Sequence, residues 1–229
     1  MEKLEEFQNI IGYHFENEEL LLRALTHSSY ANEKKIGKIK DNERLEFLGD
    51  AVLEVSSSDY LYHKYPKVPE GELTTMRASI VCEPSLAFLS KKIELGRFLR
   101  LGKGENLTGG RNRPSVLSDA FEAVIGAIYL DGGFERAKQF VHDYVMIHMD
   151  HMKLFSDSKT ILQEEVVARN MDALSYHLVE EKGPDHNKTY VVEALVGEKV
   201  FGRGEGHTKK AAEQEAAYQT LLKIRGKES

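Results

Sequence analysis

Apolar residues recur at helical spacing along most of the chain up to about residue 147. Asn17 can cap a helix whose apolar residues run from Leu20 to Leu25. Asp41 or Asn42 can cap a longer helix, which Pro66 ends. Further helices are expected over residues 73–81, 85–93 and 115–130, the last ended by Asp131-Gly132-Gly133. No strand is predicted in this part of the chain.

The pattern changes after the polar stretch from His148 to Ser156. Leu174, Tyr176 and Leu178 alternate with polar residues, and a second alternation runs from Tyr190 to Val196, as in a hairpin. A third strand through Val200 and a final helix over 208–224 give the order α-β-β-β-α. The sequence therefore predicts a mainly α domain over residues 1–147, a linker over 148–156 and a small α+β domain over 157–226.

Composition narrows the class of protein. The 229 residues are 41% hydrophobic and 30% charged, which suits one or two globular domains. Cys82 is the only cysteine and cannot close an intrachain disulfide, and no apolar stretch approaches the roughly 18 residues that span a bilayer. We therefore expect a cytoplasmic protein with no membrane partner. The net charge of −6 means that any nucleic acid must bind through a local basic patch.

One predicted helix carries a strongly acidic face. A helical wheel of residues 43–55 predicts a core-facing arc of apolar residues, namely Leu45, Leu48, Val52 and Val55. Glu43, Asp50 and Glu54 share the opposite side, and Glu46 lies about 60° from Glu43. Each like-charge pair at helical spacing costs a few tenths of a kcal/mol, so helix stability does not favour this arrangement. The face is either a solvated surface or part of a functional site.

Phe47 falls on the acidic side of the same helix, away from the apolar arc. An aromatic side chain in such a place often contacts another subunit, although a single exposed Phe is also ordinary. The wheel leaves both interpretations open.

A second acidic pair lies in a helix that is otherwise almost entirely apolar. Asp119 and Glu122 are the only charges between Ser115 and Leu130, and their spacing puts them on one face. Burying two unpaired carboxylates costs several kcal/mol or forces protonation, so a cationic partner is expected. An Arg or Lys could serve, but two acids that converge on the Glu46 and Asp50 face favour a hard metal ion such as Mg²⁺ or Mn²⁺.

The run Asn42-Glu-Arg-Leu-Glu46-Phe-Leu-Gly-Asp50-Ala-Val-Leu53 resembles the signature of bacterial ribonuclease III. The resemblance extends through Leu25-Thr-His-Ser-Ser-Tyr30, Glu70-Gly-Glu-Leu73, Leu101-Gly-Lys-Gly-Glu105, Gly109-Gly-Arg111 and Ser118-Asp-Ala-Phe-Glu-Ala123, and covers nearly the whole chain. It implies an all-helical nuclease and dimerisation domain followed by a double-stranded-RNA-binding domain, in a homodimer that cleaves double-stranded RNA. Many members have Arg where Ser28 stands and Ser where Thr208 stands.

The resemblance also implies roles for individual acids. Glu46, Asp119 and Glu122 match the family's metal ligands, and Asp50 matches its catalytic aspartate and a further ligand. Glu122 is counted among the catalytic residues, together with Glu43 and Glu70, which match acids that line the cleavage valley. Phe47 matches an aromatic knob that inserts into the partner subunit, which agrees with its place on the wheel.

The predicted last helix begins with a basic cluster. Thr208-Lys209-Lys210 puts two cations where the helix macrodipole disfavours them by about 0.3 to 1 kcal/mol, and a phosphate would explain them. Gly202, Gly204 and Gly206 come just before, but no βαβ unit follows, so a dinucleotide fold is excluded. The run from Gly204 to Ala217 resembles the double-stranded-RNA-binding signature, which implies RNA contacts by residues on both helices and in the first hairpin loop. These are Gln163, Glu164, His186, Thr208, Lys209 and Lys210.

We therefore expect a Mg²⁺-dependent endoribonuclease, with Mn²⁺ as a substitute, that cleaves double-stranded RNA. The resemblance implies 5′-phosphate and 3′-hydroxyl products and a role in processing ribosomal and other structured RNA precursors. One rival is a binding protein that has lost cleavage, which the intact acids argue against. Another is a metal phosphohydrolase acting on small nucleotides, which would leave the basic C-terminal domain without a role.

Overall fold

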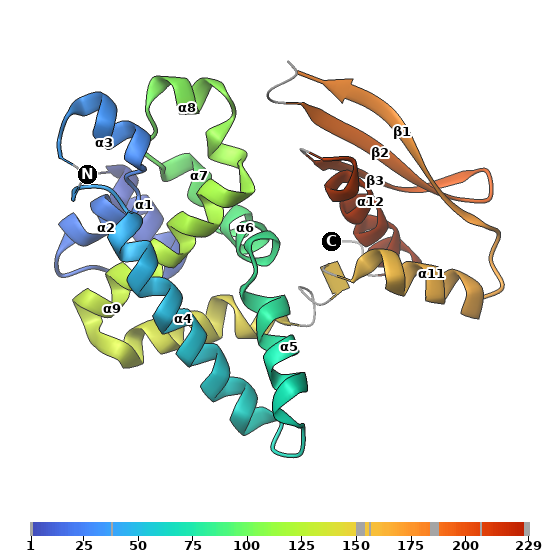
Figure 1. The fold of residues 1–229 in the computed structure, drawn as a ribbon, viewed down its shortest axis with the longest axis horizontal. Coiled ribbons are helices and arrows are strands. Elements are labelled where there is room, and N and C mark those ends of the chain that lie inside the picture. Colours follow the sequence, from blue (N-terminus) through green and yellow to red (C-terminus); the bar gives the residue numbers. More distant parts are fainter. Residues whose placement is uncertain are drawn as a thin grey trace. The chain divides into compact units, whose positions relative to one another are not determined.

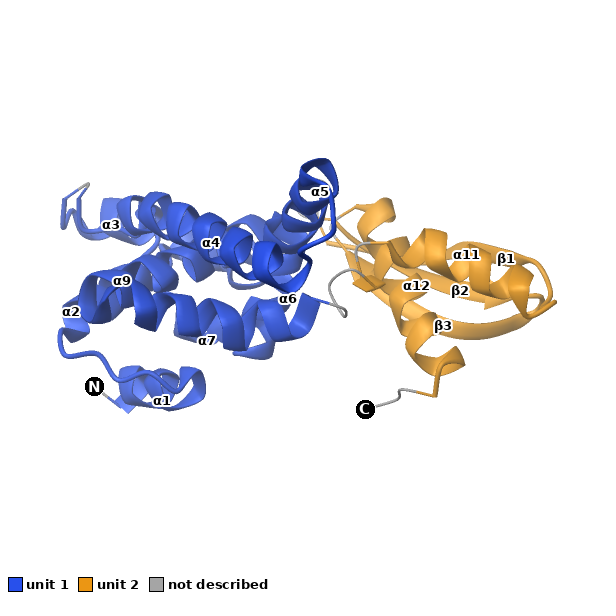
Figure 2. Ribbon diagram, turned by 90° about the horizontal axis from the view of Figure 1, so that it is seen from below, with its two compact units in different colours: residues 1–149 blue, residues 150–229 orange. Residues whose placement is uncertain are grey.

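Two units with separate cores make up the chain, Met1–Met149 and Asp150–Ser229 (Figure 2). The computed structural model describes residues 2–37, 39–149, 154–155, 157–183, 188–206 and 208–226. The first unit ends two residues beyond the predicted boundary at 147. Residues 150–153 and 156 of the predicted linker lie outside the described residues.

The first unit is helical, as predicted (Figure 1). Its elements are α1 (Glu2–Ile11), α2 (Glu18–Ala24), α3 (Ser28–Lys34), α4 (Glu43–Lys64), α5 (Glu70–Val81), α6 (Glu83–Lys92), α7 (Leu95–Phe98), α8 (Lys103–Leu107), the 3₁₀ turn η1 (Gly110–Asn112), α9 (Pro114–Tyr144) and the 3₁₀ turn η2 (Met146–His148). Asn17 caps α2 as expected, because its side chain accepts a hydrogen bond of 3.1 Å from the Glu19 backbone N–H.

Helices α4 and α9 pack along each other in the centre of this unit (Figures 1 and 2). Between Val116 and Ile128, α9 is buried on nearly all sides, in agreement with its apolar sequence. Leu45 and Leu53 of α4 are fully buried against this core. Each such side chain contributes about 1.5–3 kcal/mol of burial free energy, so the contact fixes the two helices relative to each other.

One detail differs from the sequence prediction. Val55 is 50% exposed, because the buried face of α4 is centred on the small residues Gly49 and Ser56, which turns Val55 toward solvent. The predicted helix end at residues 131–133 is confirmed, because α9 consists of two helices joined by a kink at Gly133. Gly133 has φ 80° and ψ 179°, so the backbone breaks there, but the helix resumes and buries Phe140.

The second unit has the predicted α-β-β-β-α order (Figure 1). Its elements are α11 (Ser158–Ala168), β1 (Leu174–Lys182), β2 (Thr189–Val196), β3 (Lys199–Gly206) and α12 (Lys209–Ile224). The strands form an antiparallel sheet in the order β1-β2-β3. Val192 and Ala194 of β2 pack with Ala212 and Ala216 of α12, and α11 lies against α12. The glycines of β3 allow this close packing, since a Cβ at Gly204 would overlap with the Ala212 carbonyl oxygen.

Among the described residues, no helix combines the length and hydrophobicity that a membrane crossing requires.

Candidate functional site

Helices α4 and α9 bring together acids that are more than seventy residues apart in sequence. Glu46 lies in the first turn of α4, and Asp119 and Glu122 lie in the buried first half of α9. One carboxylate oxygen from each of the three lies within 4.8 Å of the others. All three side chains are half-buried, so the cluster opens to solvent while being shielded from it on one side.

The electrostatics of this cluster reflect burial and mutual repulsion. Burial, followed by the charges of Asp119, Glu43 and Asp50, raises the pKa of Glu46 to about 7. Burial, followed by Asp50, Glu46 and Asp119, raises the pKa of Glu122 to about 8. No Lys or Arg forms an ion pair with the three cluster acids within the part of the chain that the structure describes.

Asp119 has surroundings that act on its pKa in both directions. Burial raises its pKa, while a hydrogen bond of 3.3 Å from the Ser118 hydroxyl and the charge of His27 lower it. His27 caps α3, and its Nδ1 accepts a hydrogen bond of 3.2 Å from the Ser29 backbone N–H. Asp119 thus has two partners that oppose the effect of burial on its pKa.

Two further acids of α4 flank the cluster. Asp50 and Glu43 are exposed, and their charges act on Glu46, while Asp50 also acts on Glu122. Neither belongs to the set of three whose oxygens converge. They form the solvent side of the acidic site.

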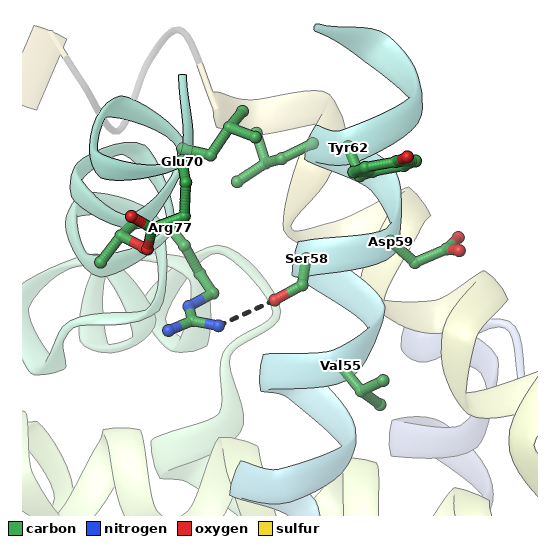
Figure 3. Close-up of a pocket in the computed structure, with 9 residues that line it drawn as sticks. Val55, Ser58, Asp59, Tyr62, Glu70 and Arg77 are labelled. Atoms are coloured by element: carbon green, nitrogen blue, oxygen red, sulfur yellow. Dashed lines mark hydrogen bonds between the residues drawn. The ribbon is translucent and has the colours of Figure 1, made fainter. Parts of the chain in front are cut away.

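Glu70 lies elsewhere in the same chain. It begins α5 and lines a pocket of about 490 Å³ with Val55, Ser58, Asp59 and Tyr62 of α4 (Figure 3). Its Oε1 accepts a hydrogen bond of 2.9 Å from the Thr74 hydroxyl. Ser58 comes twelve residues after Glu46 in α4, about 18 Å along the helix axis. The fold of one chain therefore does not bring Glu70 to the acidic cluster.

Phe47 projects from α4 with 81% of its surface exposed. Further along α4, the Ser58 hydroxyl accepts a hydrogen bond of 2.9 Å from Arg77 of α5 (Figure 3). Arg77 Nε also lies 3.0 Å from the Glu54 carboxylate, so Glu54 of the predicted acidic face serves this structural pair.

In the second unit, most of the predicted RNA-binding residues are exposed. Gln163 and Glu164 are exposed on α11, and Lys209 and Lys210 are exposed in the first turn of α12. The Thr208 side chain caps α12, because its hydroxyl accepts a hydrogen bond of 3.1 Å from the Ala211 backbone N–H. His186 lies outside the described residues.

Comparison with known proteins identifies both units. A family model described as Ribonuclease-III-like matches residues 17–149, which is more than half of the chain. The chain belongs to the ribonuclease III family. A second model, the double-stranded RNA binding motif, matches residues 158–224.

Relatives in the ribonuclease III family match along almost their whole length. The chain is 50% identical to Ribonuclease 3 of Oceanobacillus iheyensis over 93% of this chain and 95% of that protein. It is 48% identical to Ribonuclease 3 of Listeria monocytogenes over 98% of this chain and 99% of that protein. The protein is accordingly a ribonuclease III, an endoribonuclease specific for double-stranded RNA, with a double-stranded-RNA-binding motif, and its family is metal-dependent.

The nuclease unit is also similar to a solved ribonuclease III structure. The nuclease domain from Campylobacter jejuni matches with a TM-score of 0.59 and 42% identity, over 63% of this chain and 96% of that one. That structure is described as showing flexibility in a region involved in dimer formation.

Two side chains near the functional sites of this ribonuclease III could not be identified from the sequence, one beside the acidic cluster and one beside the start of α12. His27 belongs to the motif from Leu25 to Tyr30, but the sequence does not indicate that its charge acts on Asp119. No sequence motif identifies Glu181 near the end of β1. Its carboxylate lies 3.6 Å from Lys188 Nζ and 3.4 Å from Lys209 Nζ. The position of His27 just before a helix indicates that it can cap that helix. The place of Glu181 beside the start of α12 depends on strand pairing and on the packing of α12 against the sheet.

Proposed function

We propose that this ribonuclease III uses Mg²⁺, with Mn²⁺ as a substitute, to hydrolyse phosphodiesters of duplex RNA to 5′-phosphate and 3′-hydroxyl ends. Its substrates would be ribosomal and other structured RNA precursors in the cytoplasm. The observation that carries the proposal is the convergence of Glu46, Asp119 and Glu122 within 4.8 Å.

The donor set suits a hard divalent ion. Carboxylate oxygens are the ligands that Mg²⁺ and Mn²⁺ prefer, and the site offers three of them from two rigid helices. Burial, and after it the charges of the neighbouring acids, raises the pKa of both Glu46 and Glu122, so the ionised carboxylates are disfavoured when no cation is bound. Glu46, Asp119 and Glu122 would hold a divalent cation in their ionised forms, because its charge would offset the burial and the repulsion.

We assign the acids of α4 and α9 distinct tasks. Glu46, Asp119 and Glu122 would hold the ion, with Asp50 as a further ligand or as the acceptor of a hydrogen bond from the attacking water. When bound, the ion supplies Lewis acidity that activates water for in-line attack and stabilises charge on the leaving 3′ oxygen. Glu43, exposed beside Glu46, would position water on the solvent side of the site.

We further propose a homodimer in which each acidic cluster cuts one strand. The exposed Phe47 supports this arrangement, since an aromatic side chain that is 81% exposed on a central helix fits an interface anchor. Glu70 lies far from the cluster of its own chain, so any role in the cleavage valley would depend on the dimer.

The second unit would hold the duplex through its phosphates. Lys209 and Lys210 in the first turn of α12 supply cations beside the free N–H groups of the helix end. Gln163 and Glu164 on α11 would contact the minor groove, and His186 would do so from the first hairpin loop. Thr208 supports the lysines by capping their helix.

Incubation with duplex RNA, single-stranded RNA and nucleotides, each with Mg²⁺ or EDTA, tests the proposal. We expect cleavage of the duplex only, with Mg²⁺ only. Binding without cleavage would favour the rival binding protein, and nucleotide hydrolysis would favour the rival phosphohydrolase. Equal cleavage of single strands would contradict the substrate assignment.

A further inference from the structure

Glu181 of β1 joins two basic side chains on the helix-covered face of the sheet. Its Oε2 lies 3.6 Å from Lys188 Nζ, and its Oε1 lies 3.4 Å from Lys209 Nζ. Lys209 Nζ is also 5.7 Å from the centre of the Tyr190 ring. Tyr190 is the β2 partner of Glu181, so strand register places all of these groups together. The first lysine of α12 is thus engaged within the domain before any RNA arrives.

The preceding acid makes a similar arrangement on the other face of the sheet. Glu180 lies 3.1 Å from Lys182 Nζ and 4.0 Å from Arg203 Nη2. Neighbouring residues of a strand point to opposite faces of the sheet. Arg203 lies between Gly202 and Gly204, which face α12, so its side chain points to the other face. Glu180 therefore has the same charge and a comparable set of partners, but it lies away from the α12 surface.

A carboxylate in this position opposes an incoming phosphate. A phosphate oxygen bonded to Lys209 Nζ would lie within about 7 Å of the Glu181 carboxylate, which is less than the Debye length of about 8 Å at physiological salt. Like charges at that separation repel each other. The lysine must also exchange part of its contact with Glu181 for the phosphate. Both effects lower the affinity of this surface for RNA.

We propose that Glu181 is a positioning residue that weakens the hold of Lys209, and with it Lys188, on duplex RNA. This inference rests on the proposed contact between Lys209 and RNA phosphate. The carboxylate keeps the lysines at the RNA-binding surface of the free protein and acts against the phosphate when RNA binds. It thereby moderates the affinity of the domain, which favours release of the cleaved duplex.

Binding of the full chain to a labelled RNA duplex of about 20 base pairs, in EDTA to prevent cleavage, tests the proposal. Glu181→Gln should tighten binding about two- to fivefold at low salt, the range expected for loss of exposed ion pairs. It should also steepen the dependence of log Kd on log salt by up to about one unit. Glu181→Ala should behave in the same way. The control is Glu180→Gln, which makes the same charge change on the other face and should have a much smaller effect.

A double variant identifies the route of the effect. In a Lys209→Ala background, the gain from Glu181→Gln should shrink toward that of Glu180→Gln, and any remainder should disappear when Lys188 is replaced as well. Weaker binding by Glu181→Gln, or tightening equal to that of Glu180→Gln, would overturn the inference while leaving the Lys209 contact in place. If Lys209→Ala alone does not weaken binding or flatten the salt dependence, the proposed RNA contact fails and the inference fails with it.

Discussion

Gly49 of α4 and Gly126 of α9 face each other across the contact that holds the acidic cluster together. A Cβ at Gly49 would overlap with the Glu122 carbonyl oxygen, and a Cβ at Gly126 would overlap with the Leu45 carbonyl oxygen. The two helices therefore meet backbone to backbone, one helical turn or less from Glu46 and Glu122. This close approach sets the separation of the carboxylates.

Gly126→Ala should separate the helices and damage the site. We expect a loss of about 1–3 kcal/mol in the free energy of unfolding, because the added methyl group has no room. Duplex cleavage should fall by at least about tenfold, because displacements near 1 Å at a catalytic centre have large effects on rate. Gly104→Ala in α8 is the control, since nothing lies within 4 Å of its Cβ position. Full activity of Gly126→Ala would show that the close approach is not needed.

The stability of the metal-free protein should depend on pH through Glu46 and Glu122. Their pKa values of about 7 and about 8 lie above the value of about 4.3 expected for an unfolded Glu, so the folded chain binds more protons between roughly pH 4.5 and 8. The stabilisation is complete below this window and is lost as the pH rises through it. Thermal melting in EDTA from pH 5 to pH 8.5 should show a fall that is shallower in Glu122→Gln. Parallel curves for the two proteins would contradict the assignment.

Glu122→Gln should separate catalysis from stability. The amide removes one charge from a repelling cluster, so the melting temperature in EDTA should stay unchanged or rise. Cleavage with Mg²⁺ should be abolished, because one of the three converging oxygens no longer carries charge. Circular dichroism and a duplex cleavage assay measure the two effects. A marked loss of stability in EDTA would mean that Glu122 serves the fold and not a metal.

Phe47→Ala should weaken the proposed dimer without unfolding the chain. The side chain is 81% exposed in one chain, so its removal costs little within the chain, while loss of an aromatic anchor raises a dimer Kd by at least about tenfold. Analytical ultracentrifugation over a concentration series measures the change. Leu107→Ala is the matched control, because Leu107 is 85% exposed on α8. Unchanged association of Phe47→Ala would remove this residue from the interface.

The helical and strand periods of the sequence account for most of the elements. The pairing of Asp119 and Glu122 also follows from sequence, because their spacing alone puts them on one face of an apolar helix. The convergence of Glu46 on that pair depends on how α4 and α9 pack, which a helical wheel does not contain. The sequence supports this convergence only indirectly, through the need of the Asp119 and Glu122 pair for a cation and through the family resemblance.

The expected burial of Val55 in the core also failed because of the way in which α4 packs. The wheel put Val55 in the core because it ranks residues by hydrophobicity, whereas α4 turns its small residues Gly49 and Ser56 toward the core. The Gly132-Gly133 pair, in contrast, predicts the helix end correctly, because Gly133 adopts a positive φ that breaks α9 into two helices. The contact between Glu181 and Lys209 joins residues that are far apart in sequence, and it depends on the register of β1 and β2 and on the packing of α12 against the sheet.

X-ray diffraction from crystals grown with Mn²⁺, recorded near the manganese absorption edge, tests the central claim most directly. The account predicts an anomalous peak among the carboxylate oxygens of Glu46, Asp119 and Glu122, and its loss in crystals of Glu122→Gln. Manganese bound only at other acids, in a protein that cleaves duplex RNA with Mn²⁺, would contradict it.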